Sequence, residues 1–349
     1  MSFQRICPSG VSLAVGLTLS LMAAVPVHAQ SVNIYGLIGT YVGSIKRSGD
    51  ANAVTQVGSG GLTTSYLGFG GQESLAPGLK LSFALESFFR SDTGGMGRSS
   101  ADPMWSRNAW VALEGDLGRL AVGRQTNPIY AQMGQLSPFG SSVVFSPLVL
   151  QSFIASYGSG GVAVVKGDTV WDNVIQWTKQ FDNGLKLGGL VAPGEVSGRN
   201  GMGNGQLNLT YKSGPLYVAA SVQSVRAYST TVLTNGQQTA LLGAHYDFAH
   251  FTLYGNVVRM SQDEVAHSSQ WDAGVGVPVS AAGKLMLEAS QRHYKADTDG
   301  AETVKRTTWS FGYDHRLSKR TDVYAIYGGD RLDGSAYASS AAVGIRHTF

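Results

Sequence analysis

The 349-residue chain has little charge and almost no cysteine. Asp, Glu, Lys and Arg make up 14% of the residues, against about 25% in an ordinary soluble domain. A formal net charge of +3 is too weak a balance to favour nucleic acid as a partner. With a single cysteine, the chain also has no disulfide framework of its own.

Long apolar runs of the kind that a helical membrane bundle needs, about 20 residues each, are also missing. Glycine and aromatic residues are abundant instead, with 46 Gly, 15 Tyr, 13 Phe and 6 Trp. So many aromatic residues exclude a disordered chain, because they supply apolar surface to bury. What is left is a Gly-rich, charge-poor chain that is long enough for one large domain.

Residues 1–29 are typical of a cleaved secretory signal. Arg5 gives the positive start, residues 11–25 form a short apolar stretch, and residues 27–29 form a small-x-small cleavage site. We therefore predict export with cleavage at about Ala29.

An N-terminal membrane anchor is the alternative for this segment, but Gly16 and Pro26 interrupt a stretch that is already short. The only cysteine, Cys7, lies inside it, so the predicted mature chain, 30–349, has neither a disulfide nor a thiol nucleophile.

A period of two dominates the rest of the chain. In one stretch, apolar Leu79, Leu81, Phe83 and Leu85 alternate with polar or small Lys80, Ser82, Ala84 and Glu86. The same alternation recurs near residues 285–290 and 337–349. It predicts strands with one apolar and one wettable face. No stretch of the predicted mature chain shows a convincing helical stripe with capping residues.

Turn residues punctuate these strands at regular intervals. Short turns are predicted at 75–78, 114–118, 181–184, 213–215, 247–250, 280–283 and 317–320. Longer polar stretches include 47–62, 92–104, 196–204, 227–237 and 295–303. Seven short turns that alternate with eight longer loops connect sixteen strands. The mature length of 349 − 29 = 320 residues then gives about 20 residues per strand and connection, enough for a tilted membrane strand.

Two architectures satisfy sixteen amphipathic strands: a soluble sandwich or propeller, and a membrane barrel. The strict alternation of short and long connections favours the barrel. The residues on the inward-facing side of the strands are small and polar, which also favours the barrel. Aromatic residues at strand ends favour it as well: Phe181, Tyr211, Tyr217, Tyr246, Phe248, Phe251 and Tyr313. The predicted fold class is therefore all-β, a 16-stranded antiparallel transmembrane β-barrel.

Short motifs in a fixed order link the chain to a known family. They lie at 31–36, 67–75, 78–80, 85–87, 120–125, 128–130, 138–140, 317–324 and 342–349. Together they resemble the general trimeric porins of Gram-negative outer membranes, in particular those of β-proteobacteria. The likeness covers essentially all of 31–349.

The resemblance implies a homotrimer in the outer membrane, in contact with outer-membrane lipid and lipopolysaccharide. It implies a water-filled channel for passive diffusion of ions and small hydrophilic solutes. The long loop at roughly 126–168 is expected to fold into the lumen as a constriction. The terminal Phe349 fits the family's signal for the outer-membrane assembly machinery.

The expected constriction loop departs from the family pattern of acidic loop residues opposite basic wall residues. Residues 117–167 contain no Asp or Glu. Anion-preferring relatives carry Arg at positions that here resemble Tyr66 and Val170, while Arg107 and Arg124 are kept. We hypothesise a weak anion preference. The candidate constriction residues are Tyr66, Glu86, Arg90, Arg107, Arg124, Tyr130 and Gln132.

Three points remain open at this stage. Strict alternation from Leu120 and Val122 turns Arg124 outward, whereas the family pattern turns it inward, and a β-bulge reconciles the two. The apolar run 143–150 either packs the loop against the wall or makes a narrower, less polar passage. The channel is either a general porin or a substrate-selective channel of the same fold.

Catalytic chemistry is not visible in the sequence. The histidines are scattered without metal-ligand spacing, and no nucleophile elbow or phosphate loop occurs. Asp297 and Asp299 faintly resemble a calcium loop that lacks the remaining ligands, so we expect a solvated loop there. We predict no enzyme activity, no cofactor and no metal.

Overall fold

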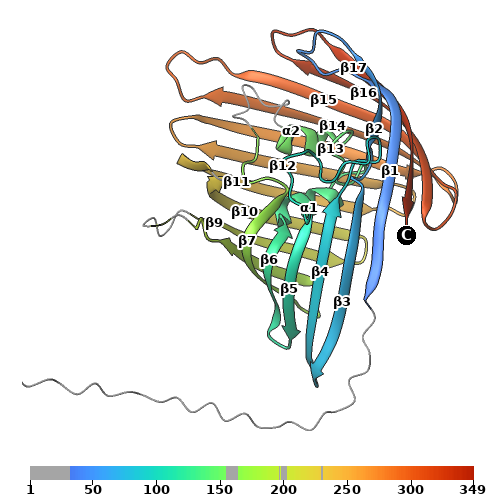
Figure 1. Cartoon of the computed structure of the whole chain (residues 1–349). Coiled ribbons are helices and arrows are strands. Elements are labelled where there is room, and N and C mark those ends of the chain that lie inside the picture. The colour runs from blue at the N-terminus through green and yellow to red at the C-terminus, as the bar shows by residue number, and fades with distance from the viewer. Residues whose placement is uncertain (1–31, 155–163, 196, 198–202, 229–230) are drawn as a thin grey trace, which may run out of the picture. The chain divides into compact units, whose positions relative to one another are not determined.

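The computed structural model describes residues 32–154, 164–195, 197, 203–228 and 231–349. The predicted signal segment, with its cleavage site at about Ala29, lies outside these residues. The described chain is dominated by antiparallel strands (Figure 1). In order they are β1 (Asn33–Ile45), β2 (Val54–Ser59), β3 (Tyr66–Ala76), β4 (Leu79–Phe88), β5 (Asn108–Gly115), β6 (Gly118–Thr126), β7 (Val170–Gln180), β8 (Leu185–Ala192), β9 (Asn204–Ser213), β10 (Leu216–Tyr228), β11 (Thr231–Asp247), β12 (Thr252–Gln262), β13 (Ala266–Pro278), β14 (Gly283–Ala296), β15 (Val304–Arg316), β16 (Thr321–Leu332) and β17 (Ala338–Thr348).

Sixteen of these strands form a closed wall. Each pairs with its neighbour in the chain, and β1 closes the ring because Leu37 lies opposite Thr348 of β17 and Tyr66 of β3. The predicted sixteen-stranded antiparallel barrel is confirmed. The extra strand β2 lies in the stretch 47–62, which was expected to be a loop. It pairs with the C-terminal half of β1, residues 40–45.

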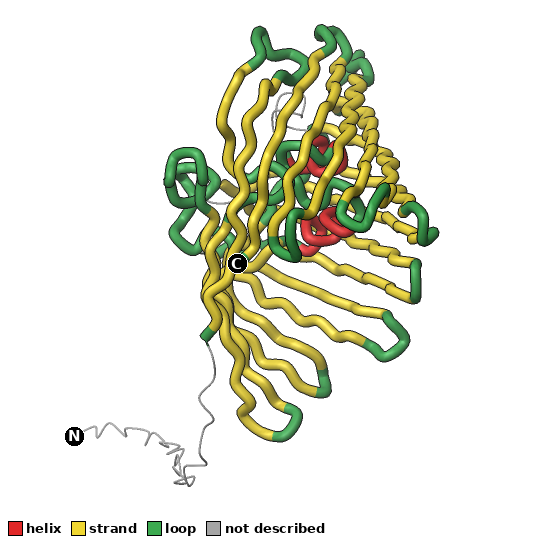
Figure 2. The backbone as a smooth tube through the Cα atoms, turned by 90° about the vertical axis from the view of Figure 1, so that its right-hand side faces the viewer, coloured by secondary structure: helices red, strands yellow, loops and turns green. Residues whose placement is uncertain are grey.

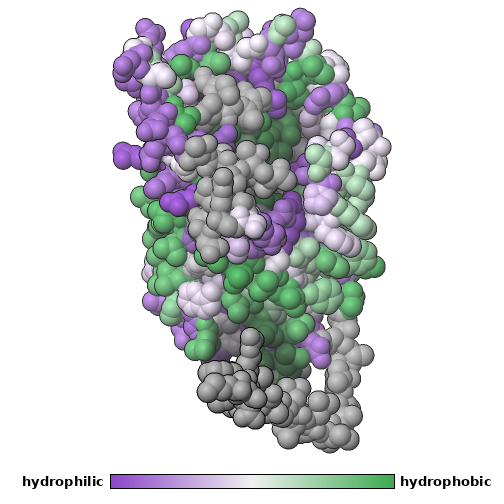
Figure 3. Space-filling view, turned by 60° about the vertical axis from the view of Figure 1, so that its left-hand side comes forward, coloured by the Kyte–Doolittle hydropathy of each residue, from purple (hydrophilic) through white to green (hydrophobic). Residues whose placement is uncertain are grey.

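The connections alternate in length as the turn residues predicted. All seven short turns occur at the expected places, and they lie together at one end of the strands (Figure 2). In the wall, large apolar residues such as Leu207, Val257 and Leu287 are exposed, while alternate positions such as Glu288 and Ser290 are buried. Figure 3 shows hydrophobic residues gathered mainly in the lower half of that view and hydrophilic ones toward the top. This is the pattern of a wall that faces lipid.

In its described part, the long connection between β6 and β7, residues 127–169, carries two helices. These are α1 (Pro128–Gln135) and α2 (Pro147–Phe153), capped by the side chains of Asn127 and Ser146. Neither helix was predicted from the sequence. An Asn or Ser followed by Pro is a helix-start signal, but each helix is too short to show a periodic stripe. No helix in the described part of the chain is long and apolar enough to cross a membrane.

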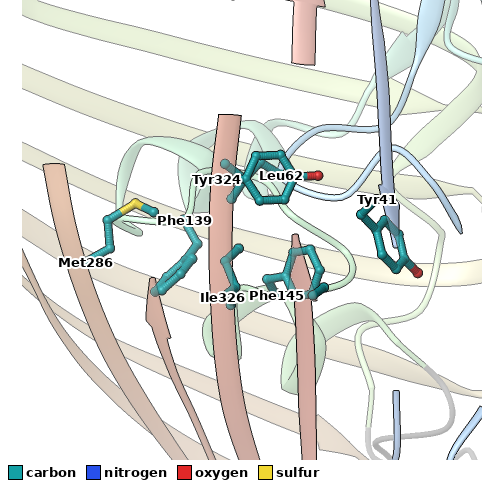
Figure 4. Packing of buried hydrophobic residues seen from close by; sticks show 8 residues of the cluster. Tyr41, Leu62, Phe139, Phe145, Met286, Tyr324 and Ile326 are labelled. Carbon is teal, nitrogen blue, oxygen red and sulfur yellow. The ribbon is translucent and has the colours of Figure 1, made fainter. Parts of the chain in front are cut away.

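The segment between the two helices packs against the inner face of the wall. Phe145 meets Tyr41 of β1 and Tyr324 of β16 edge to face, at ring-centroid distances of 5.4 and 6.2 Å (Figure 4). Phe139 belongs to the same buried cluster. Each fully buried side chain of this kind stabilises the packing by about 1.5–3 kcal/mol.

A second buried cluster joins the two helices to β10, β11 and β12. Its members are Ile129, Met133, Leu136, Leu148, Val149, Ala219, Leu241 and Val258. In the apolar run 143–150, Phe145 and residues 147–150 are buried. The structure therefore supports the first of the two interpretations of this run, in which it packs the loop against the wall.

Candidate functional site

Three of the candidate residues meet on the inner wall around one buried carboxylate. Glu86 lies on the inner face of β4, and both the Arg107 guanidinium and the Asn108 side-chain amide donate hydrogen bonds to its Oε2 atom. The Tyr35 hydroxyl donates to the other oxygen, Oε1, at 2.7 Å. We call Tyr35, Tyr66, Glu86, Arg107 and Asn108 the Arg107 cluster.

The ring of Tyr66 also contacts the Arg107 guanidinium. The Cζ atom of Arg107 lies 4.1 Å from the centre of this ring, a cation–π distance. Gly68 makes room for Tyr35, because a Cβ atom at this position would lie 2.6 Å from the Tyr35 ring. The sequence brings together β1, β3, β4 and the start of β5 to build this cluster.

Tyr130 of α1 packs edge to face against Phe153 of α2, with ring centroids 5.4 Å apart. Its hydroxyl donates to the Ser141 carbonyl at 2.8 Å. Burial raises the pKa of Tyr130, and the charges of Arg107 and Arg98 act in the opposite direction, so both cations lie within electrostatic range of this hydroxyl. At neutral pH Tyr130 is therefore a neutral group.

Gln132 anchors α1 to the wall. Its amide nitrogen donates to the Leu209 carbonyl at 3.1 Å, and its oxygen accepts from the Ser221 hydroxyl at 2.6 Å. Asn127 makes a second anchor through Gln223 at 3.0 Å. Gln132 is buried, so the structure assigns it to the attachment of the helix and not to the Arg107 cluster.

A single carboxylate, that of Glu288 on β14, anchors α2. The Ser137 hydroxyl donates to it at 2.7 Å, and the Leu148 amide in the first turn of α2 donates at 3.4 Å. Gln151 of α2 adds a hydrogen bond to Thr308 at 2.9 Å. Sequence reasoning missed Glu288, because nothing in a strand's alternation shows which inward residue meets a distant loop.

Arg124 lies at a β-bulge. The pairing of β6 with β7 shifts between Gly123 and Gln125, and Gly123 has a φ of 127°. The Arg124 guanidinium donates to the Ser106 carbonyl at 3.0 Å and pairs with Asp172 on β7. The side chain of Arg124 is 12% exposed and that of Asp172 is 62% exposed. Hence Asp172, not Arg124, presents the charge to solvent.

A third ion-pair group ties two loops together. Arg98 pairs with Asp102 and with Asp168, both at 2.8 Å, and so joins residues 98–102 to the end of the long loop. Burial alone would raise the pKa of both carboxyls, but hydrogen bonds from Arg98 and its charge outweigh burial and lower them. The same bonds raise the pKa of Arg98 against its own burial.

Arg90 does not reach the Arg107 cluster. The strand β4 ends at Phe88, and two backbone hydrogen bonds of 2.8 Å fold Arg90 into a tight turn with Gly94 and Gly95. The structure thus brings together Tyr66, Glu86 and Arg107, with Tyr130 in electrostatic range. It does not add Arg90, Arg124 or Gln132 to them.

Two members of the cluster were missed from the sequence. Tyr35 lies on the inward parity of the first strand, and Asn108 directly follows Arg107. Within the described residues, no group of three or more His, Cys, Asp or Glu side chains is arranged to hold a metal ion. The Asp297 carboxylate instead accepts a hydrogen bond from the Nδ1 atom of His267 at 2.7 Å.

The family is established by comparison with known proteins. Residues 15–335 match the model of the Gram-negative porin family, and the chain belongs to this family. It is an outer-membrane porin, a passive channel for ions and small hydrophilic solutes, and not an enzyme.

The most informative relatives span its whole length. The chain is 27% identical to an outer membrane porin protein of Bordetella pertussis, over 95% of this chain and 99% of that protein. It is 22% identical to outer membrane porin protein 32 of Delftia acidovorans, over 95% and 99%. Among solved structures, the anion-selective porin from Comamonas acidovorans superposes with a TM-score of 0.73 at 22% identity, covering 92% of this chain and all of that one.

Proposed function

We propose that this porin has a weak anion preference and that its constriction lies between Tyr130 of α1 and the Arg107 cluster. The observation that carries the proposal is the unequal exposure of one ion pair. The Glu86 side chain is 8% exposed, whereas that of Arg107 is 28% exposed. A solute in the lumen therefore meets the cation and not the carboxylate.

The strength of the preference follows from the same pair. The carboxylate neutralises much of the guanidinium's field at a distance, so only an ion that comes close feels a net positive charge. Screening by salt shortens that range to about 8–10 Å. The similarity to a porin described as anion-selective supports the same sign.

The reversal potential of the purified protein in a planar bilayer tests this proposal. With a KCl gradient across the membrane, a weak anion preference shifts the reversal potential slightly toward the equilibrium potential of chloride. A potential of the opposite sign, set by potassium, would contradict it.

We further propose a homotrimer. One solved structure similar to this chain, OmpT of Vibrio cholerae, is described as a trimer form, with a TM-score of 0.63. The detergent-solubilised protein is expected to have three times the mass of one chain by light scattering, and a mass of one chain would refute the trimer. The exposed apolar residues of the wall are proposed to contact outer-membrane lipid and lipopolysaccharide.

Phe349 is proposed to be the signal for the outer-membrane assembly machinery. Its backbone pairs with Gly36 through hydrogen bonds of 3.1 and 3.2 Å, so the terminus lies at the seam between β17 and β1. Removal of Phe349 is expected to lower the amount of barrel in the membrane without preventing refolding in detergent. Equal loss in both experiments would assign Phe349 a structural role only.

A substrate-selective channel of the same fold is the second candidate. The neighbouring rings of Tyr217, His245 and Tyr254, with Lys212 and Lys284 beside them, favour this candidate, because aromatic rings and ammonium groups bind solutes. Saturation of the conductance by one solute supports this candidate, and a linear conductance supports the general porin.

A further inference from the structure

Three rings stand in register on the inner wall near the short turns. Tyr217 of β10 lies opposite His245 of β11, which lies opposite Tyr254 of β12. The rings of Tyr217 and His245 are stacked, with centroids 5.0 Å apart and planes at 14°. The centroids of His245 and Tyr254 are 5.4 Å apart.

These rings face the lumen side of the wall. The Nδ1 atom of His245 lies 3.0 Å from the carbonyl oxygen of Gln135, the last residue of α1. A carbonyl only accepts hydrogen bonds, so Nδ1 carries the hydrogen and Nε2 is left as an acceptor when the ring is neutral. Tyr217 packs against the buried cluster that holds α1. The rings therefore lie next to the helix that bears Tyr130.

Two lysines flank the rings. Lys284 of β14 leans over Gly276, where a Cβ atom would lie 2.6 Å from the lysine Cε and 3.8 Å from the Tyr254 ring. Lys212 of β9 lies opposite Tyr217. The charges of both lysines act on His245. Within the described residues neither ammonium group forms a hydrogen bond or a direct ion pair, although the charge of Asp314 acts on Lys284.

The acidic side chains of Asp247, Asp314 and Glu288 lie within electrostatic range of these groups, but within the described residues none of them forms a direct ion pair with Lys212 or Lys284. Asp314 lies opposite Lys284 on β15, but Lys284 leans across Gly276 in the other direction, toward Tyr254. Asp247 accepts a hydrogen bond from the Ala249 amide at 2.9 Å in the adjacent turn. Two ammonium groups thus remain available beside three rings.

We propose that Lys284, Tyr254 and His245, with Lys212 and Tyr217 beside them, form a binding site for small aromatic carboxylates. We call it the Lys284 site. An ammonium group binds a carboxylate by a charge-assisted hydrogen bond, and the positive edges of the rings attract the face of an aromatic solute. The site lies on the short-turn side of the constriction, and its role rests on the proposed channel function.

Benzoate is the probe that tests the Lys284 site. Single-channel current is recorded in KCl while sodium benzoate is added from the short-turn side. Cyclohexanecarboxylate has the same charge without the aromatic ring, and benzyl alcohol has the ring without the charge. We expect benzoate to reduce the chloride current with saturation, cyclohexanecarboxylate to need a clearly higher concentration, and benzyl alcohol to have no effect.

Two variants localise the effect. Lys284→Met keeps the apolar stem and removes the charge, and it is expected to weaken benzoate block roughly fivefold, because a close ion pair in water is worth about 1 kcal/mol. Tyr254→Leu is expected to abolish the difference between benzoate and cyclohexanecarboxylate. Lys295→Met is the control, since Lys295 lies on the same strand with its side chain on the opposite, exposed face.

The block is expressed relative to the open conductance of each variant in KCl, and only inserted channels are scored, so differences in folding or basal current do not confound the comparison. If Lys284→Met does not insert, Lys212→Met tests the same charge effect from the other side of His245. Equal block by benzoate and cyclohexanecarboxylate, or unchanged block in the lysine variants, would overturn the proposal. In those outcomes the protein still conducts ions, whereas a failure of the channel function itself gives no conductance.

Discussion

The Arg107 guanidinium and the Glu86 carboxylate form an ion pair whose two sides are unequally exposed. Glu86 is enclosed by Tyr35 and Asn108, which also donate hydrogen bonds to it, and Arg107 is held over the Tyr66 ring. The pair therefore has a fixed orientation with its positive side toward the lumen. We propose that the selectivity of this porin depends on that orientation.

Glu86→Gln is expected to strengthen the anion preference. The amide keeps an acceptor for Tyr35 but removes the negative charge, so Arg107 acts with its full field. The chloride-to-potassium permeability ratio is expected to rise by up to roughly fivefold, because a unit charge at close approach in water is worth about 1 kcal/mol. Reversal potentials in a KCl gradient measure the ratio.

Glu73→Gln is the matched control for this substitution. Glu73 is a half-exposed carboxylate on β3, and its removal is expected to leave the ratio unchanged. If both variants shift the ratio equally, general charge and not the Arg107 pair sets the selectivity.

Arg107→Gln is expected to destabilise the barrel more than Glu86→Gln does. It leaves a buried carboxylate without its cation, and breaking a buried pair in this way costs about 3–5 kcal/mol. The double variant Glu86→Gln, Arg107→Gln removes both charges and should regain most of the loss. Thermal unfolding in detergent gives the three values, and strictly additive effects would mean that the two residues are not coupled.

Glu288→Gln is expected to loosen the long loop without changing the strands. One of the two carboxyl oxygens that accept from the Ser137 hydroxyl and the Leu148 amide is replaced by an NH2 group, at a cost of roughly 1–3 kcal/mol. Single-channel recordings should show larger current fluctuations in the open state. A quiet channel indistinguishable from wild type would show that the apolar clusters alone hold the loop.

Acid is expected to release the contact between residues 98–102 and the long loop. Asp102 and Asp168 have lowered pKa values in the folded protein, so their stabilising effect is present above the ordinary carboxyl pKa of about 4. It is lost as the pH falls through the lowered values. Pepsin cleavage within 89–107 should therefore begin only well below pH 4 in wild type.

Arg98→Gln provides the comparison for this acid transition. Without the guanidinium the two carboxyls lose the group that lowers their pKa, so cleavage is expected at a higher pH. If cleavage begins at the same pH in both proteins, the Arg98 ion pairs do not determine the acid stability of this segment.

Alternation and turn residues were enough to predict the barrel. A strand in a closed wall has only two faces, and odd and even positions point to opposite ones. The stretch 79–86 shows this, because its apolar residues Leu79, Leu81 and Phe83 share one face and Glu86 lies on the other. The seven short turns followed from residues such as Pro77 and Gly78. The bulge beside Arg124 was anticipated as well, because inward placement conflicted with strict alternation.

Contacts between distant segments were beyond this reasoning. Glu288 meets Ser137 across 151 positions, and Gln132, a candidate for the constriction, instead holds α1 against Ser221. The alternation along a strand predicts that a residue such as Glu288 points inward, but it does not predict whether the side chain contacts water, a helix or another side chain. The short helices and β2 were missed for a related reason, since each is too brief to establish a period.

Cysteine chemistry at position 107 tests the proposed constriction most directly. Apart from Cys7 in the predicted signal segment the chain has no cysteine, so a single new thiol can be modified selectively. In the double variant Glu86→Gln, Arg107→Cys, a cationic methanethiosulfonate reagent is expected to raise the chloride-to-potassium permeability ratio and an anionic one to lower it. If neither reagent changes the ratio or the conductance while mass spectrometry shows complete labelling, Arg107 does not line the path of the ions.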